Sequence, residues 1–247
     1  MKGLKALIAV AVLLAGLSTP AHAILTIEIT QGVEGGLPIA VVPFGSSAKA
    51  PPPQDIGAVV AADLARSGRL SPLEAKDFVS RPTEDRQVVF KDWRIVKAEA
   101  LVIGAVKPAG SGQWQVEFRL YDVFKEKQLA GYSYTVASDR LRAVAHQISD
   151  LVYEKLTGEP GVFSTRVAYI TREKARRGFN YKLQVADADG YNPVTVLSSS
   201  EPLMSPAWSP DGTRLAYVSF ETRRPVLYMQ NIASGARTRL AELNGIN

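Results

Sequence analysis

Residues 203–220 read Leu-Met-Ser-Pro-Ala-Trp-Ser-Pro-Asp-Gly-Thr-Arg-Leu-Ala-Tyr-Val-Ser-Phe. The Pro-Asp-Gly run at 210–212 predicts a tight turn, because proline fixes φ, aspartate can bond its own backbone and glycine can take a positive φ. After the turn, Leu215 and Tyr217 alternate with other residues, which indicates a strand. We therefore predict two short strands around a turn, with Trp208 buried on the first.

The strand after the turn has an earlier copy in the chain. Arg-Val-Ala-Tyr-Ile-Thr at 166–171 matches Arg-Leu-Ala-Tyr-Val-Ser at 214–219, and the copies start 48 residues apart. A second strand, a Gly turn and a third strand follow each copy. A self-similar period in the forties, built of short strands, is typical of β-propeller blades. We predict about two blades over residues 161–247, an incomplete set beside the roughly four to eight of a closed propeller.

Upstream of the blades, helical and strand patterns interleave. Strands are predicted at 37–44, 100–106, 113–123 and 129–136, and helices at 55–66, 91–97 and 141–156, with a short irregular or helical piece at 73–79. The last three strands alternate in the manner of an antiparallel meander. We therefore predict an α/β domain at 33–160, followed by the all-β start of a propeller at 161–247.

The chain begins like a secretory signal. Lys2 and Lys5 give a basic start, residues 7–14 are all apolar, and Ala-His-Ala at 21–23 resembles a cleavage site. The apolar run is shorter than the roughly 20 residues that span a bilayer. We expect residues 1–23 to be removed as a signal peptide and the product to be exported, with no transmembrane span in the mature chain.

The segment after this signal alternates strictly between apolar and polar residues. Leu25, Ile27 and Ile29 share one face, and a glycine-rich run at 31–36 follows. Two interpretations stay open: an edge strand of the chain's own domain, or an arm that adds to the sheet of another protein. The predicted arm consists of Ile24, Leu25, Thr26, Ile27, Glu28, Ile29, Thr30, Gln31 and Gly32.

Composition points away from catalysis and metal binding. The chain has no cysteine, and His146 is the only histidine after the predicted signal, so a zinc site would have too few of its preferred ligands. We interpret His146 as a satisfied or exposed helix residue and not as a general base. Asp-Ala-Asp-Gly at 187–190 begins like a calcium loop, but its glycine comes too early, and we predict a hairpin turn. We predict no catalytic residue, metal or cofactor.

Two other groups of side chains favour structural interpretations. A basic cluster lies between two predicted blade strands and comprises Arg172, Lys174, Arg176 and Arg177. The formal net charge of +5 is modest, so we expect a solvated loop and no nucleic-acid partner. Trp208, Tyr217 and Tyr169 recur at the blade spacing, which predicts core packing.

An ordered set of motifs resembles a known family. The set comprises Ala-Trp-Ser-Pro-Asp-Gly followed by Leu-Ala-Tyr at 207–217, Ile-Ala-Val-Val-Pro-Phe at 39–44, Asp-Ile-Gly-Ala-Val-Val-Ala-Ala-Asp-Leu at 55–64 and Lys-Leu-Thr-Gly at 155–158. These motifs resemble the TolB family, the periplasmic β-propeller proteins of the Tol–Pal system. The resemblance covers nearly the whole chain, including the signal.

The resemblance implies a periplasmic, non-catalytic protein that links TolA of the inner-membrane complex to Pal, the outer-membrane lipoprotein. The family supports outer-membrane integrity and invagination during cell division, and colicins use the same surfaces during import. In the family the extreme N-terminal segment binds TolA, which by position is residues 24–32 here. The propeller binds Pal mostly through blades other than these two, so no Pal contact is assigned to a residue.

An alternative function stays open at this point. The chain could be the N-terminal part of a periplasmic propeller-containing hydrolase whose catalytic domain lies beyond residue 247. Such an enzyme would continue into an α/β-hydrolase domain with a G-x-S-x-G nucleophile elbow.

Overall fold

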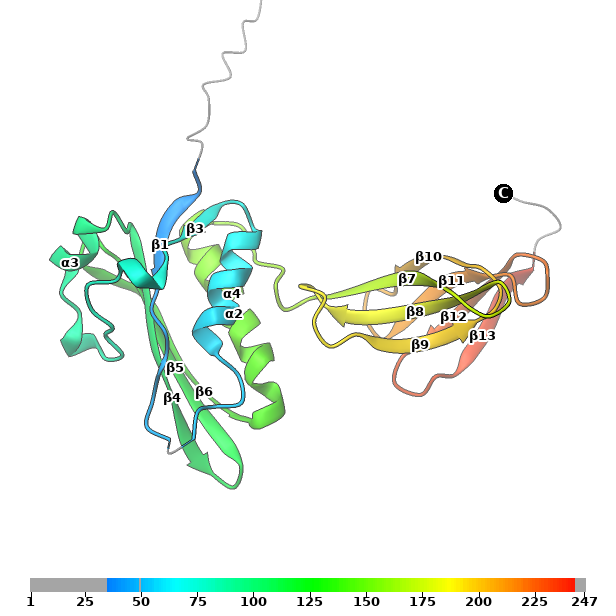
Figure 1. Cartoon of the computed structure of the whole chain (residues 1–247), viewed down its shortest axis with the longest axis horizontal. Helices are drawn as coiled ribbons and strands as arrows, with labels where there is room; N and C mark the ends of the chain where they lie inside the picture. Colours follow the sequence, from blue (N-terminus) through cyan, green and yellow to red (C-terminus); the bar gives the residue numbers. More distant parts are fainter. Residues whose placement is uncertain (1–34, 49, 243–247) are drawn as a thin grey trace, which may run out of the picture. The chain divides into compact units, whose positions relative to one another are not determined.

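The computed structural model describes residues 35–48 and 50–242 (Figure 1). Up to residue 157 it alternates strands and helices, and from residue 166 onward its described elements are all strands. The predicted fold class, an α/β part followed by propeller blades, is confirmed. The described helices are α2 (Ile56–Arg66), α3 (Phe90–Ile95) and α4 (Leu141–Thr157), with 3₁₀ turns at Ala75–Asp77, Asp85–Gln87 and Ser138–Arg140.

Helices α2 and α4 begin and end where local chemistry favours it. The Asp55 carboxylate accepts a hydrogen bond from the amide of Ala58 at 3.0 Å, which satisfies one of the free N–H groups at the start of α2. Gly158 ends α4 with a φ of 78°, and its amide donates to the carbonyl of Glu154 at 2.8 Å. Both helices therefore match their predicted ranges to within one residue.

The first sheet has the strand order β3-β1-β4-β5-β6, with β2 also paired to β4. Its strands are β1 (Leu37–Val41), β2 (Gly45–Ser46), β3 (Leu70–Pro72), β4 (Ala100–Gly110), β5 (Gln113–Asp122) and β6 (Lys127–Ala137). Strand β1 runs parallel to both β3 and β4, and β4, β5 and β6 form the predicted antiparallel meander.

Two details of this sheet differ from the predictions. The strand predicted at 37–44 ends at Val41, just before Pro43, which has no N–H group to donate to a neighbouring strand. The sequence does not predict strand β3, because three residues are too few for an alternating pattern to show. It forms only because β1 supplies its backbone partners.

The first sheet is covered on both faces (Figure 1). Ile39 and Val41 pack with residues of α2 and α4 on one face. Ala40 and Val42 pack on the other face, in a cluster that includes Trp93 of α3. Burial on both faces explains the continuous apolar run that begins β1.

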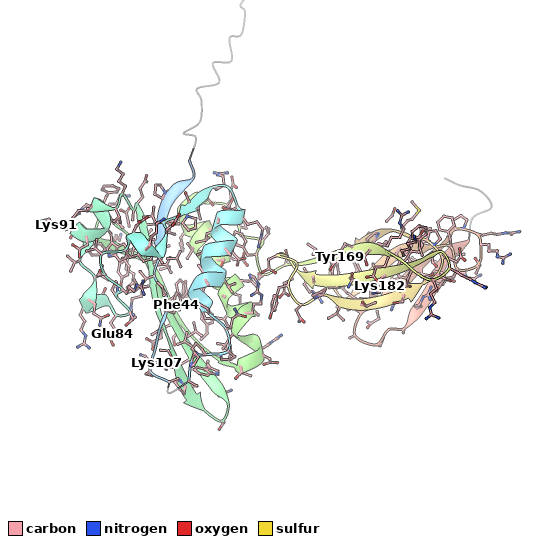
Figure 2. The ribbon with its side chains drawn as sticks, viewed as in Figure 1. Phe44, Glu84, Lys91, Lys107, Tyr169 and Lys182 are labelled. Atoms are coloured by element: carbon pink, nitrogen blue, oxygen red, sulfur yellow. The ribbon has the colours of Figure 1, made fainter. Side chains whose placement is uncertain are left out.

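A row of aromatic side chains crosses the face of the sheet that carries α2 and α4. Phe44, labelled in Figure 2, lies over Gly104 of β4, where a Cβ atom would also stand only 2.6 Å from the Glu117 carbonyl oxygen. Gly104 is paired with Phe118 of β5, which is 1% exposed. The Phe118 ring stacks on Tyr132 of β6, with ring centres 6.0 Å apart. The missing side chain at Gly104 therefore makes room for the Phe44 ring.

The remaining strands form two antiparallel sheets in chain order. One sheet contains β7 (Arg166–Lys174), β8 (Phe179–Asp187) and β9 (Val194–Ser199). The other contains β10 (Leu203–Trp208), β11 (Arg214–Ser219), β12 (Val226–Asn231) and β13 (Arg237–Glu242). The two copies found in the sequence begin β7 and β11, so the predicted repeat is confirmed.

The turn between β10 and β11 has the predicted structure. The Gly212 amide donates to the Ser209 carbonyl at 2.9 Å, and Gly212 has a φ of 66°. The Asp211 carboxylate accepts from the Thr213 amide at 3.1 Å. Hydrogen bonds from the Ser209 hydroxyl and from Thr213 lower the pKa of Asp211 to about 2. The turn is therefore stabilised by the side chains that its own sequence supplies.

The two blade sheets share one apolar core in which a hydrogen-bonded chain is buried. Tyr217 is 0% exposed, and its hydroxyl donates to the Gln230 side chain at 2.8 Å. The Gln230 amide in turn donates to the Val196 carbonyl of β9 at 3.1 Å. Burial raises the pKa of Tyr217 to about 12. Because these bonds run from β11 through β12 to β9, they join one sheet to the other.

The predicted core packing is correct for Tyr217; Trp208 packs against the same core but is only half-buried; and the prediction is wrong for Tyr169. Ala168 and Ile170 of β7 pack in the shared core. Since side chains alternate along a strand, Tyr169 between them (Figure 2) lies on the opposite face of its sheet and is only half-buried. Equivalent residues of successive blades point in the same direction, from one blade toward the next. Tyr169 and Tyr217 therefore cannot both enter the core between these two sheets.

Candidate interaction site

The predicted partner-binding arm, residues 24–32, lies outside the described residues, as does the predicted signal at 1–23. The described chain starts at Gly35 and enters β1 two residues later. The first described residues after the predicted arm are therefore Gly35 and Gly36, which we call its root.

The two glycines at this root have different surroundings. A Cβ atom on Gly35 would meet nothing within 4 Å, whereas one on Gly36 would stand 2.8 Å from the carbonyl carbon of Leu70. Directly after Gly36, the Leu37 amide donates to the Arg69 carbonyl at 2.9 Å. Of the two glycines, only Gly36 is thus in close backbone contact beside β3.

The different surroundings of Gly35 and Gly36 allow a matched pair of alanine substitutions. Gly36→Ala is expected to lower the free energy of unfolding by about 1–3 kcal/mol, because backbone atoms of residues 69 and 70 must move to admit the new methyl group. Gly35→Ala meets no atoms and should stay within about 1 kcal/mol of the parent chain. Urea denaturation of both variants measures the difference. Equal effects at the two positions would show that the close packing at Gly36 contributes nothing to stability.

A buried polar cluster joins α2 to α4. One oxygen of Asp63 lies 2.6 Å from His146 Nδ1 and accepts from the Ser149 hydroxyl at 2.8 Å. The other oxygen of Asp63 pairs with the Arg66 guanidinium at 3.0 Å. Asp63 and Ser149 are fully buried and His146 is 3% exposed, so the hydrogen bonds among these three residues form away from water, whereas the Arg66 side chain is 40% exposed. The cluster fixes the orientation of the His146 ring.

This cluster does not have the arrangement of a Ser-His-Asp catalytic triad. In a triad the serine hydroxyl bonds to the imidazole and the carboxylate bonds to its other nitrogen. Here Ser149 and His146 both bond to the same carboxylate, and the Ser149 hydroxyl is also 3.0 Å from the Ala145 carbonyl. The arrangement positions side chains and does not activate Ser149 as a nucleophile.

Next to His146, Arg142 of α4 contacts the turn between β8 and β9. Its guanidinium pairs with Asp189 and, at 3.7 Å, with Asp187, and it lies 3.9 Å from the centre of the Tyr191 ring. Burial opposes ionisation of Asp189, but hydrogen bonds from the Tyr191 amide and the charge of Arg142 outweigh it and lower the Asp189 pKa. Arg142, His146, Asp187 and Tyr191 line a cavity of about 400 Å³.

The sequence predictions for these residues are partly correct. Asp-Ala-Asp-Gly at 187–190 is the predicted hairpin turn, because the Gly190 amide donates to the Asp187 carbonyl at 2.8 Å and Gly190 has a φ of 83°. The sequence predicts a satisfied or exposed His146, but the residue is buried and only its Nδ1 atom has a partner. The sequence carried no signal that the turn and His146 meet.

The basic cluster is exposed, as predicted for a solvated loop. Arg172 and Lys174 end β7, and Arg176 and Arg177 lie in the connection to β8. The Arg172 guanidinium lies 4.5 Å from the centre of the Phe179 ring.

Comparisons with known proteins place both parts of the chain in one family. The model of the TolB amino-terminal domain matches residues 25–129, and that of the TolB beta propeller domain matches residues 153–247. The Tol-Pal system protein TolB of Nitrosococcus oceani is 52% identical over 93% of this chain, and that of Methylobacillus flagellatus is 49% identical over 92%. This chain belongs to the TolB family.

A solved TolB structure agrees with this assignment. The crystal structure of TolB from Acinetobacter baumannii matches 86% of this chain at 37% sequence identity, with a TM-score of 0.74. The chain spans about half the length of these relatives: 53% and 52% of the two curated TolB proteins and 51% of the crystallised one. Among the described residues, no helix is long and apolar enough to cross a membrane.

Proposed function

We propose that this chain is a non-catalytic binding protein of the Tol–Pal system in the periplasm, where its arm at 24–32 binds TolA and its propeller part serves binding to Pal. Membership of the TolB family carries the proposal, because the relatives are named as Tol-Pal system proteins. In this proposal residues 1–23 direct export, residues 33–160 form the α/β domain and residues 161–247 begin the propeller. Its role is to support outer-membrane integrity and invagination during division.

The first sheet offers the arm little opportunity to pair with a strand of its own domain. Strand β1, which follows the arm, already has β3 on one side and β4 on the other. The open edges of the described sheet are those of β3, which has three residues, of β2, which has two residues and pairs only with β4, and of β6, which lies three strands away from β1. An alternating segment rooted beside β3 therefore has more to gain from the sheet edge of another protein, by strand addition.

The energetics of such an arm favour reversible binding. Burying the side chains of Leu25, Ile27 and Ile29 would contribute roughly 1.5–3 kcal/mol each. Ordering about seven residues would cost about 1–2 kcal/mol each in backbone entropy. Main-chain hydrogen bonds to the partner must supply the balance, so the surplus is small. Modest affinity suits a contact that forms and breaks as the envelope moves.

The test uses the mature chain and a soluble form of TolA. Deleting residues 24–30, or changing Ile27 and Ile29 together to Asp, should abolish TolA binding measured by calorimetry. The matched control changes Thr26 and Thr30 to Asp. The alternating pattern predicts these residues on the opposite face of an extended segment, so this variant should keep most of the affinity. Circular dichroism on each variant reports whether the α/β domain stays folded.

Three results would contradict this proposal. Unchanged TolA affinity in the deletion variant would remove the segment from the interface. Loss of folded structure in the deletion variant would instead identify the segment as an edge strand of its own domain. Equal loss of binding in the Ile and the Thr variants would argue against one apolar face.

The alternative of a propeller-containing hydrolase has less support. The relatives reported above are named TolB and not hydrolases.

A further inference from the structure

The His146 ring has one nitrogen without a partner although the ring is buried. Its Nδ1 atom is 2.6 Å from the Asp63 carboxylate, whereas Nε2 makes no hydrogen bond. In a neutral ring whose Nδ1–H donates to a carboxylate, Nε2 presents a lone pair. A buried polar atom left unpaired costs free energy, so an atom in this position calls for an explanation.

Metal-binding histidines have the same arrangement. They commonly donate their second ring N–H to a carboxylate, which fixes the tautomer and makes the ligating nitrogen more basic. In this chain Asp63 already provides that carboxylate, and Ser149 and Arg66 hold Asp63 in place. The free nitrogen of His146 is therefore prepared as a ligand by residues on two helices.

Two carboxylates lie close to the His146 ring. Ligand atoms of His146, Asp187 and Asp189 lie within 4.8 Å of one another. In a tetrahedral zinc site, with bonds of about 2.0–2.2 Å, neighbouring ligand atoms are roughly 3.4 Å apart. The two aspartates belong to a hairpin turn, so small side-chain rotations can bring their oxygens closer. The adjoining cavity of about 400 Å³ leaves room for a water molecule as fourth ligand.

We propose that His146, Asp187 and Asp189 bind one divalent transition-metal ion of the Zn²⁺ type. One imidazole nitrogen and two carboxylates suit Zn²⁺ better than Mg²⁺ or Ca²⁺, which favour oxygen ligands alone. The bound ion would tie α4 to the turn between β8 and β9.

Arg142 competes with a metal ion for the two carboxylates of this site. Its guanidinium already pairs with both aspartates, so a metal ion must displace it. The Nε atom of Arg142 is buried and makes no hydrogen bond, so the guanidinium is incompletely satisfied where it lies. Arg142 also lines the cavity, so its side chain can leave the two carboxylates without crossing the core.

Calorimetric titration of the untagged, chelator-treated chain with ZnCl₂ tests the site. One ion should bind per chain, and Asp187→Asn and Asp189→Asn should each weaken binding roughly 10–100-fold or more. Arg142→Gln should tighten binding, because it removes the competing charge. Asp211→Asn is the control: it alters the turn between β10 and β11, where Asp211 accepts hydrogen bonds from Ser209 and Thr213, and it should leave Zn²⁺ affinity unchanged.

His146→Gln should also abolish binding, and circular dichroism will show whether that variant folds. If it does not fold, the two aspartate variants and Arg142→Gln still decide the question. Binding that the aspartate variants do not weaken would overturn the proposal. So would the absence of binding to the parent chain, including the case in which only Arg142→Gln binds Zn²⁺.

Discussion

Replacing Asp63 with alanine is expected to lower the free energy of unfolding by about 3–5 kcal/mol, the usual cost of removing one partner from a buried charged network. The substitution leaves His146 Nδ1 and the Ser149 hydroxyl in the interior without their acceptor. It also deprives Arg66 of its ion pair. Urea denaturation measures the loss. In a Trp208→Phe background, tryptophan fluorescence reports only on Trp93 and Trp114 of the α/β part.

Two controls define what the Asp63 result means. Asp63→Asn keeps the shape and one acceptor, so it should recover part of the loss. Glu74→Ala removes an exposed ion pair with Lys76 and should cost less than about 1 kcal/mol. If Asp63→Ala cost no more than Glu74→Ala, the cluster between α2 and α4 would contribute little to stability.

Replacing Phe118 with alanine is expected to cost about 3–5 kcal/mol, as for other fully buried aromatic residues. The ring lies on the sheet face that packs against α2 and α4, and it stacks on Tyr132 and Tyr134. Its removal leaves a cavity that the paired strands cannot close, because β5 is bonded on both sides. The same fluorescence-monitored urea denaturation measures this variant.

Phe118→Leu is the matched control for this prediction. It keeps most of the apolar volume and should cost less than about 1.5 kcal/mol if the neighbours can adjust. A loss of equal size in the two variants would show that ring stacking, and not cavity formation, dominates. A loss below about 1 kcal/mol for alanine would contradict the central place of Phe118 in this core.

The sequence alone determined the features that depend on near neighbours in the chain. The turn at 210–212 forms because proline, aspartate and glycine each favour its dihedral angles locally. Helix α2 begins at Asp55 and helix α4 ends at Gly158 for equally local reasons. The repeat also needed only comparison along the chain. These features led to the fold class and to the family.

Only the tertiary structure decided the features that join distant residues. Asp63 meets His146, and His146 lies beside Asp187 and Asp189, because separate elements pack together, and no periodicity records such a meeting. Strand β3 likewise depends on β1 for its partners. Tyr169 and Tyr217 have the same sequence context but different burial, because only one of the two faces the neighbouring sheet. Local chemistry specifies each element, whereas packing between elements decides which side chains become a site.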